Sequence, residues 1–270
     1  MDKKWHFPNT DQLSIITATT LLTYVIMPYI KISAQEIEIP FLGMIFNFKL
    51  NFSTVISLAA GIMAAFGTDW IIKGHPKYEN QSSTIHLIIP SLTVMALAIP
   101  LNIINLSPQW WGVFILGSVI FLISLIAEYI AIDRDDARYP AAAMFLTAVS
   151  SVFSLILLIS LRAAQYRLYS YVLVWLPFFF FFTNRIMHFF SKMSWSVEET
   201  AVVVFIVMQW IIGFHYWPIS PLAFGLAITG PAYLTITIVR TRINNPRKSI
   251  KYLESFIILG IFWVFAYLFR

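Results

Sequence analysis

Residues Ala59–Pro90 read AAGIMAAFGTDWIIKGHPKYENQSSTIHLIIP. An apolar segment rich in Ala and Gly runs to a single acid, Asp69, and is broken at Gly74–Pro76. A polar stretch follows, and a second apolar segment begins at His86. Gly and Pro interrupt helices, and about 20 apolar residues cross the hydrocarbon core of a bilayer. The stretch therefore predicts two transmembrane helices joined by a short polar loop.

The same alternation of apolar segments and short polar connections covers the whole chain. Apolar residues make up 59% and charged residues 11% of the 270 residues, and the mean hydropathy is +0.77. Soluble domains are nearer half apolar and a quarter charged. We therefore predict an all-α polytopic membrane protein, residues 1–270 forming one membrane domain with the lipid bilayer as its partner. The nine predicted spans are Leu13–Ile30, Ser53–Ile72, His86–Ile104, Trp111–Ile132, Pro140–Leu161, Leu168–Phe190, Thr200–Trp217, Pro221–Val239 and Leu253–Phe269, with eight as the alternative because the first and last are the weakest.

Small residues mark two of these spans as closely packed. The second span contains Ala60, Gly61, Ala64 and Gly67, and small residues four apart let helix backbones approach each other in lipid. The fifth span, with its alanines and Ser150–Ser151, is a second candidate for close packing.

The distribution of Lys and Arg predicts the orientation. Twelve of the eighteen fall in segments on the side of the N-terminus, five on the other side and one inside a span. Cytoplasmic loops carry the excess of Lys and Arg, so we predict a cytoplasmic N-terminus and, with nine spans, an extracytoplasmic C-terminus. The bases are spread among loops without a stacking platform, so the net charge of +5 does not indicate a nucleic-acid partner.

Residues 33–52, between the first two spans, predict an outer β-hairpin. Apolar and polar side chains alternate strictly from Phe46 to Phe52 and again over Glu36–Ile39, which is the period of a half-buried strand. Pro40–Gly43 supplies the turn between them. We expect the apolar side to rest on lipid or on the helices. A structural cap is the plainer interpretation, and a docking edge for a membrane protein partner is the functional one.

Ionisable residues on three spans are predicted to lie at one depth. Counted from the outer edge of each span, Asp69 lies 17 residues after Phe52, Glu128 lies 17 after Trp111, and Arg185 lies 17 after Leu168. At 1.5 Å per residue, each is about 25 Å down. A charge near the inner edge of the hydrocarbon costs a few kcal/mol unless it is paired or reaches water. Arg185 is the expected partner of one acid, and burial of the other would suit it to proton transfer.

The candidate catalytic residues are therefore Asp69, Glu128 and the nearby His75 and His86, and the candidate ligand-binding residues are Arg185 and His188. His188 lies three residues after Arg185, on the same helical face. The competing interpretation is structural, because residues within a turn of the interface can extend their charged ends to water or to lipid head groups.

Metal and cofactor chemistry receives little support. The chain has no Cys, which excludes disulfides, thiolate catalysis and Cys-based metal sites. Asp133, Asp135 and Asp136 are weak candidates for a Mg²⁺ site because carboxylate oxygens suit that ion. No second acidic motif accompanies them, so a solvated loop with balanced charges is preferred, and no cofactor is predicted.

Three classes of function fit these residues. The first is a membrane enzyme or binding protein with an acid/His/Arg site at the cytoplasmic interface for an amphiphilic or anionic ligand. The second is a non-catalytic subunit or scaffold of a membrane protein complex. The third is a proton-coupled transporter, which the absence of a visible internal repeat makes the weakest.

Overall fold

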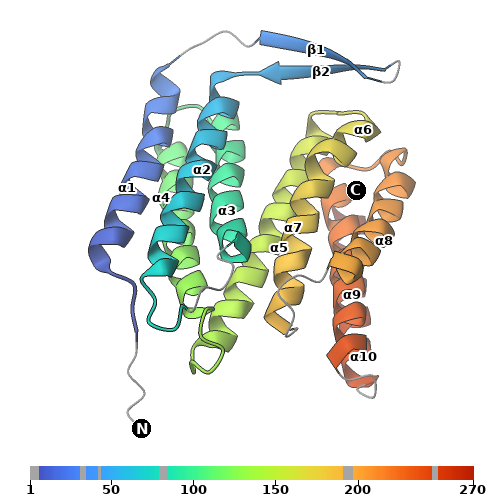
Figure 1. The fold of residues 1–270 in the computed structure, drawn as a ribbon. Helices are drawn as coiled ribbons and strands as arrows, with labels where there is room; N and C mark the ends of the chain where they lie inside the picture. Colours follow the sequence, from blue (N-terminus) through green and yellow to red (C-terminus); the bar gives the residue numbers. More distant parts are fainter. Residues whose placement is uncertain (1–5, 31–34, 42–43, 79–83, 191–196, 245–248) are drawn as a thin grey trace. The chain divides into compact units, whose positions relative to one another are not determined.

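The computed structural model describes residues 6–30, 35–41, 44–78, 84–190, 197–244 and 249–270 (Figure 1). The chain divides into two compact units, Met1–Ala142 and Ala143–Arg270, here called unit 1 and unit 2. Each unit is built from helices, as the apolar segments predict.

Unit 1 contains four long helices, a short 3₁₀ turn and two strands. In chain order they are α1 (Thr10–Ile26), η1 (Met27–Tyr29), β1 (Gln35–Phe41), β2 (Met44–Leu50), α2 (Phe52–Lys73), α3 (Thr84–Ile103) and α4 (Pro108–Ile130). Three helix starts have side-chain caps that the sequence supplies, since Asn9, Asn51 and Ser107 each accept a hydrogen bond from the first turn. The predicted spans lie within a few residues of these bounds.

The core of unit 1 forms where small residues of α2 meet its neighbours. A side chain added at Gly67 would overlap Ile16 of α1, and one added at Gly61 would overlap Met95 of α3. The predicted close packing of α2 is therefore confirmed. Buried Tyr24 of α1 also donates a hydrogen bond to the carbonyl oxygen of Val94, at 2.7 Å, which ties α1 to α3.

Strands β1 and β2 pair antiparallel, with Gln35 opposite Leu50 and Phe41 opposite Met44 (Figure 1). Residues 33–34 and 42–43 of the predicted segment 33–52 lie outside the described residues. The side that faces lipid or helices stays a prediction.

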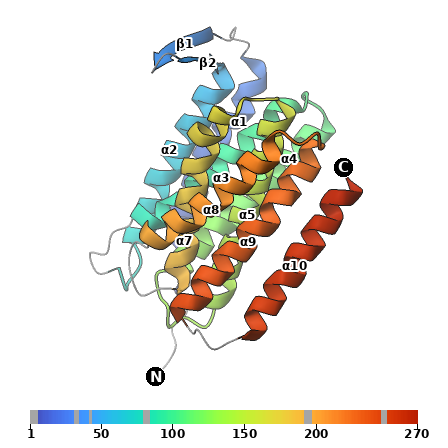
Figure 2. The ribbon, with the colours of Figure 1, turned by 90° about the vertical axis from the view of Figure 1, so that its right-hand side faces the viewer.

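Unit 2 begins within α5 (Tyr139–Ala163). Its other elements are α6 (Leu168–Ser170), the π-helical segment η2 (Tyr171–Trp175), α7 (Leu176–Phe190), α8 (Val197–His215), α9 (Pro221–Asn244) and α10 (Ser249–Leu268). Figure 2 shows α10 running beside α9, which it contacts along its length. A side chain added at Gly225 of α9 would overlap Leu155 and Ile159 of α5, so α9 also packs closely against α5.

The sixth predicted span is not one regular α-helix. It starts with α6, widens into the π-helical turn of η2 and continues as α7. Pro177 explains the widening, because proline has no N–H to donate to the carbonyl of Leu173 and its ring crowds that carbonyl. By contrast, α9 passes through Gly230 and Pro231 without interruption.

Among the described residues, seven helices are long and apolar enough to cross a membrane. They are Phe52–Lys73, Thr84–Ile103, Pro108–Ile130, Tyr139–Ala163, Tyr171–Phe189, Val197–His215 and Pro221–Arg242. The protein is therefore an integral, multi-pass membrane protein, as predicted. The first and last predicted spans, which the sequence marks as weakest, are the two outside this set.

Candidate functional site

In unit 1, two predicted site residues form a buried pair. The Nδ1 atom of His86, on α3, lies 2.9 Å from Oε2 of Glu128, on α4. The Glu128 side chain is fully buried and that of His86 is 9% exposed. A buried carboxylate is costly unless it is hydrogen-bonded, and a His partner can share or carry its proton. This pair is the arrangement in unit 1 best suited to hold a proton within the membrane.

Asp69 has a different environment. Its carboxylate lies 2.6 Å from the Nζ atom of Lys73, one turn further along α2, and the two side chains are 24% and 56% exposed. A surface pair at this spacing contributes only about 0.3–0.5 kcal/mol. Asp69 is thus paired within its own helix, and a catalytic role for it stays a prediction.

His75 lies in the turn that follows α2 and is buried against aromatic rings. Its ring makes an edge contact with Tyr129, with 4.6 Å between centroids, and Nδ1 accepts a hydrogen bond from the backbone of Lys77. Burial, reinforced by the nearby charge of His6, lowers the pKa of His75 below its ordinary value. The neutral imidazole is thereby favoured, and a catalytic role for His75 stays a prediction.

The acidic loop after α4 is held by local ion pairs. Asp133 lies 2.8 Å from the Nζ atom of Lys77, and Asp136 lies 2.6 Å from Nη2 of Arg138. Partial burial alone would raise the pKa of Asp133, but the hydrogen bond with Lys77 outweighs it, and the pKa lies below its ordinary value. Within the described part of the chain, no three His, Asp or Glu side chains are grouped to hold a metal ion.

The two predicted ligand-binding residues lie on α7, in unit 2. Arg185 is fully buried, with its guanidinium carbon 4.4 Å from the centroid of the Phe189 ring, and His188 is half-buried. Asp69 and Glu128 belong to unit 1 and Arg185 belongs to unit 2. The pairing of Arg185 with one of these acids therefore stays a prediction.

Unit 2 contains a cavity of about 260 Å³ that these predictions did not include. Its polar wall is formed by α5 and part of α9, and its apolar wall by Trp175, Phe179, Phe182 and Ile186 from η2 and α7. The α7 residues are three and four positions apart, so they form one stripe along that helix. Small-molecule sites are typically about 300–1,000 Å³ and mostly apolar with a few polar groups, which this cavity approaches.

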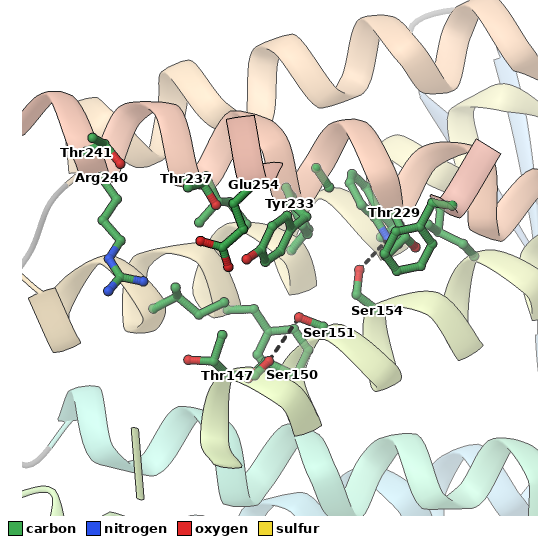
Figure 3. A pocket seen from close by; sticks show the side chains of 18 residues that line it. Thr147, Ser150, Ser151, Ser154, Thr229, Tyr233, Thr237, Arg240, Thr241 and Glu254 are labelled. Carbon is green, nitrogen blue, oxygen red and sulfur yellow. Dashed lines mark hydrogen bonds between the residues drawn. The ribbon is translucent and has the colours of Figure 1, made fainter. Parts of the chain in front are cut away.

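The polar wall is a stripe of hydroxyl groups on α5. Thr147, Ser150, Ser151 and Ser154 follow the spacing of one helical face, and Figure 3 shows them along the same side of the cavity. The Oγ atom of Ser154 accepts a hydrogen bond from the indole N–H of Trp175, at 3.2 Å, which joins the polar wall to the apolar one.

Two charged side chains line the cavity at different positions. Arg240, from the last part of α9, lies at one end, and Glu254, from the first part of α10, lies beside Tyr233 further along the cavity (Figure 3). Along α9 the lining runs from Thr229 to Thr241, or about 18 Å at 1.5 Å per residue. The cavity is therefore elongated, with Arg240 at one end and aromatic rings and hydroxyls along its length.

Unit 1 has a larger and more open depression, of about 510 Å³. Its polar side chains are Asn51, Ser53, Asn102 and Asn105, none of which is charged. It offers no ionic anchor, so the cavity of unit 2 is the stronger candidate for a ligand site.

Sequence reasoning missed this cavity although part of its signal was present. The Ser and Thr residues of the fifth span share a helical face, but Ser150–Ser151 also fits close packing between helices. Arg240 is one of the twelve Lys and Arg residues predicted on the inner side, and Glu254 is a single acid at the start of the last predicted span. Only the packing of α5, α7, α9 and α10 brings these residues together.

Comparison with known proteins gives one family match. A family model described as a protein of unknown function (DUF5656) matches residues 32–269. No curated protein and no solved structure matches the chain.

Proposed function

The chain belongs to the DUF5656 family, and from that premise we propose that it is a membrane protein that binds a single-chain amphiphile with an anionic head group in the cavity of unit 2. The observation that carries the proposal is the difference between the two parts of the cavity: one end has a charged side chain, and the remainder has aromatic rings. Arg240 stands at one end, and the aromatic rings of η2 and α7 line the remainder. An amphiphile has the same division between a charged end and an apolar chain.

The anionic head group is assigned from the chemistry of Arg240. A guanidinium presents several N–H donors in a plane and binds phosphate or carboxylate oxygens more strongly than neutral donors do. Glu254 and Tyr233 lie further along the cavity, away from this anion contact. One chain is assigned because a cavity of about 260 Å³ is small for two.

The proposed topology places the charged end of the cavity on the cytoplasmic side. We propose nine spans, with α1 and α10 added to the seven long apolar helices, a cytoplasmic N-terminus and an outer hairpin at residues 33–52. In this topology α9 ends and α10 begins on the cytoplasmic side. The ligand's head group would then lie at the level of the inner leaflet, as expected of the amphiphile site proposed from sequence, with Arg240 as its anion contact.

A proton-linked function is the second candidate, and the buried pair of His86 and Glu128 favours it. A carboxylate and an imidazole within hydrogen-bond distance can exchange a proton. In this alternative unit 1 supplies proton binding, whether for catalysis or for coupled transport.

Replacement of Arg240 tests the proposed function. We expect Arg240→Gln to weaken the binding of dodecyl phosphate roughly tenfold or more, because a charge-assisted hydrogen bond contributes about 1.5–3 kcal/mol. Equilibrium binding is measured on the purified protein in phosphatidylcholine nanodiscs, with empty nanodiscs as the blank. Arg242→Gln is the matched control, since Arg242 is on the same turn of α9 but is exposed and does not line the cavity.

Three outcomes oppose the proposal. Equal losses for Arg240→Gln and Arg242→Gln would indicate a general surface charge effect. Equal affinity for dodecyl phosphate and dodecyltrimethylammonium would show that the site does not select an anionic head group. A wild-type protein that binds neither, but co-purifies with a stoichiometric protein partner, would favour the scaffold hypothesis.

A further inference from the structure

Four hydroxyl groups on the cavity wall already use their protons inside the protein. Thr147, Ser150 and Ser151 each donate to the backbone carbonyl four residues earlier on α5, at 2.7, 2.7 and 2.9 Å. Thr229 does the same on α9, at 2.8 Å. All four side chains line the cavity (Figure 3).

This bonding determines what the wall can offer a ligand. A Ser or Thr hydroxyl has one proton and two lone pairs. When the proton is donated to the helix's own carbonyl, the oxygen keeps its capacity to accept and has no proton left to give. The α5 stripe therefore presents a row of hydrogen-bond acceptors.

From this we infer that the amphiphile bound in the cavity carries hydrogen-bond donors, amide N–H or hydroxyl groups, along the part that lies beside Thr147, Ser150 and Ser151. The inference rests on the proposed function and names the class of its ligand. The three α5 acceptors extend over the five residues from Thr147 to Ser151, about 6 Å along the helix. An N-acyl or hydroxylated amphiphile can donate hydrogen bonds to this row. An ester of the same length has only acceptor oxygens, which would lie opposite the acceptor oxygens of the wall.

A matched pair of ligands tests the inference. N-lauroyl phosphoethanolamine and 2-(lauroyloxy)ethyl phosphate share the phosphate and the chain and differ in one group, an amide N–H in place of an ester oxygen. We expect the amide to bind wild-type protein in nanodiscs about fivefold to tenfold more tightly, as one neutral hydrogen bond provides.

Variants on α5 locate the effect. Ser151→Ala and Thr147→Val each remove an acceptor, so each should reduce the amide's advantage over the ester toward twofold or less. Ser160→Ala is the matched control: Ser160 also donates to the carbonyl four residues earlier on α5, at 2.8 Å, but it does not line the cavity. The readout is a ratio of two affinities on one protein sample, so a partial loss of folded protein does not affect it.

The outcomes separate this inference from the proposed function. If dodecyl phosphate binds through Arg240 but the amide and ester bind equally, the donor requirement is wrong and the amphiphile site stands. An advantage of the amide that Ser160→Ala reduces as much as Ser151→Ala also overturns the inference. If none of the anionic amphiphiles binds, the proposed function fails and the inference fails with it.

Discussion

Glu128 is fully buried in unit 1, and the position of His86 explains how the fold tolerates it. Removing a charge from water costs several kcal/mol, which a nearby partner with good hydrogen-bond geometry offsets. Asp69 shows a different case, because it is partly exposed and pairs with Lys73 on the same helix. Two acids at the same predicted depth thus differ in environment.

The difference predicts different effects of substitution. Glu128→Leu should lower the free energy of unfolding by about 1–3 kcal/mol, because it leaves the buried His86 without this partner. The double variant His86→Leu/Glu128→Leu should recover part of the loss, since paired polar groups replaced together by apolar ones are often tolerated. Denaturant titration in detergent measures each value.

Asp69→Asn provides the comparison for these variants. The pair with Lys73 is partly exposed and lies within one helix, so loss of this pair should contribute no more than about 0.5 kcal/mol to the change in stability. The loss of unfolding free energy in the double variant is compared with the summed losses of His86→Leu and Glu128→Leu. A loss in the double variant as large as that sum, or larger, would show that His86 and Glu128 do not stabilise each other.

Two helices with small residues, α2 and α5, use them in different ways. On α2, Gly67 and Gly61 let the backbone approach Ile16 and Met95. On α5, the Ser and Thr stripe faces a cavity that α7, α9 and α10 complete. The same sequence signal therefore produces tight packing in unit 1 and a polar wall in unit 2.

The packing role of α2 predicts the effect of a single methyl group. Gly67→Ala should lower the free energy of unfolding by about 1–3 kcal/mol, because Ile16 is branched at Cβ and has little freedom to move away. Gly112→Ala on α4 is the control, since a side chain there meets no other atoms within 4 Å. It should leave stability unchanged or raise it by up to about 1 kcal/mol. Equal effects of the two variants on thermal unfolding in detergent would contradict close packing at Gly67.

For the protein in its membrane, the proposed topology sets which loops share a side. Nine spans place the loop after α4 in the cytoplasm and put the loop before α4 and the C-terminus outside. The natural chain has no Cys, so single cysteines introduced at chosen sites give labelling without background.

We therefore expect Gln109→Cys and Arg270→Cys to react with a membrane-impermeant maleimide in intact cells. Asp135→Cys should react only after permeabilisation. If Arg270→Cys, like Asp135→Cys, reacts only after permeabilisation, α10 does not cross the membrane and eight spans are indicated. Reaction of Asp135→Cys in intact cells would show that the orientation is opposite to the proposed one.

The sequence by itself determined the membrane class, the approximate bounds of the helices and the close packing of α2. Those properties follow from composition, from the length needed to cross a bilayer and from the spacing of small residues, all of which are local in the chain. Only the tertiary structure decided that His86 is the partner of Glu128 and that Arg240 and Glu254 share a cavity with the α5 hydroxyls. The physical reason is that helices in lipid are apolar on nearly every side, so their hydrophobic pattern does not indicate which face meets another helix. The rotation of each helix, and hence the site, depends on contacts between residues far apart in the chain.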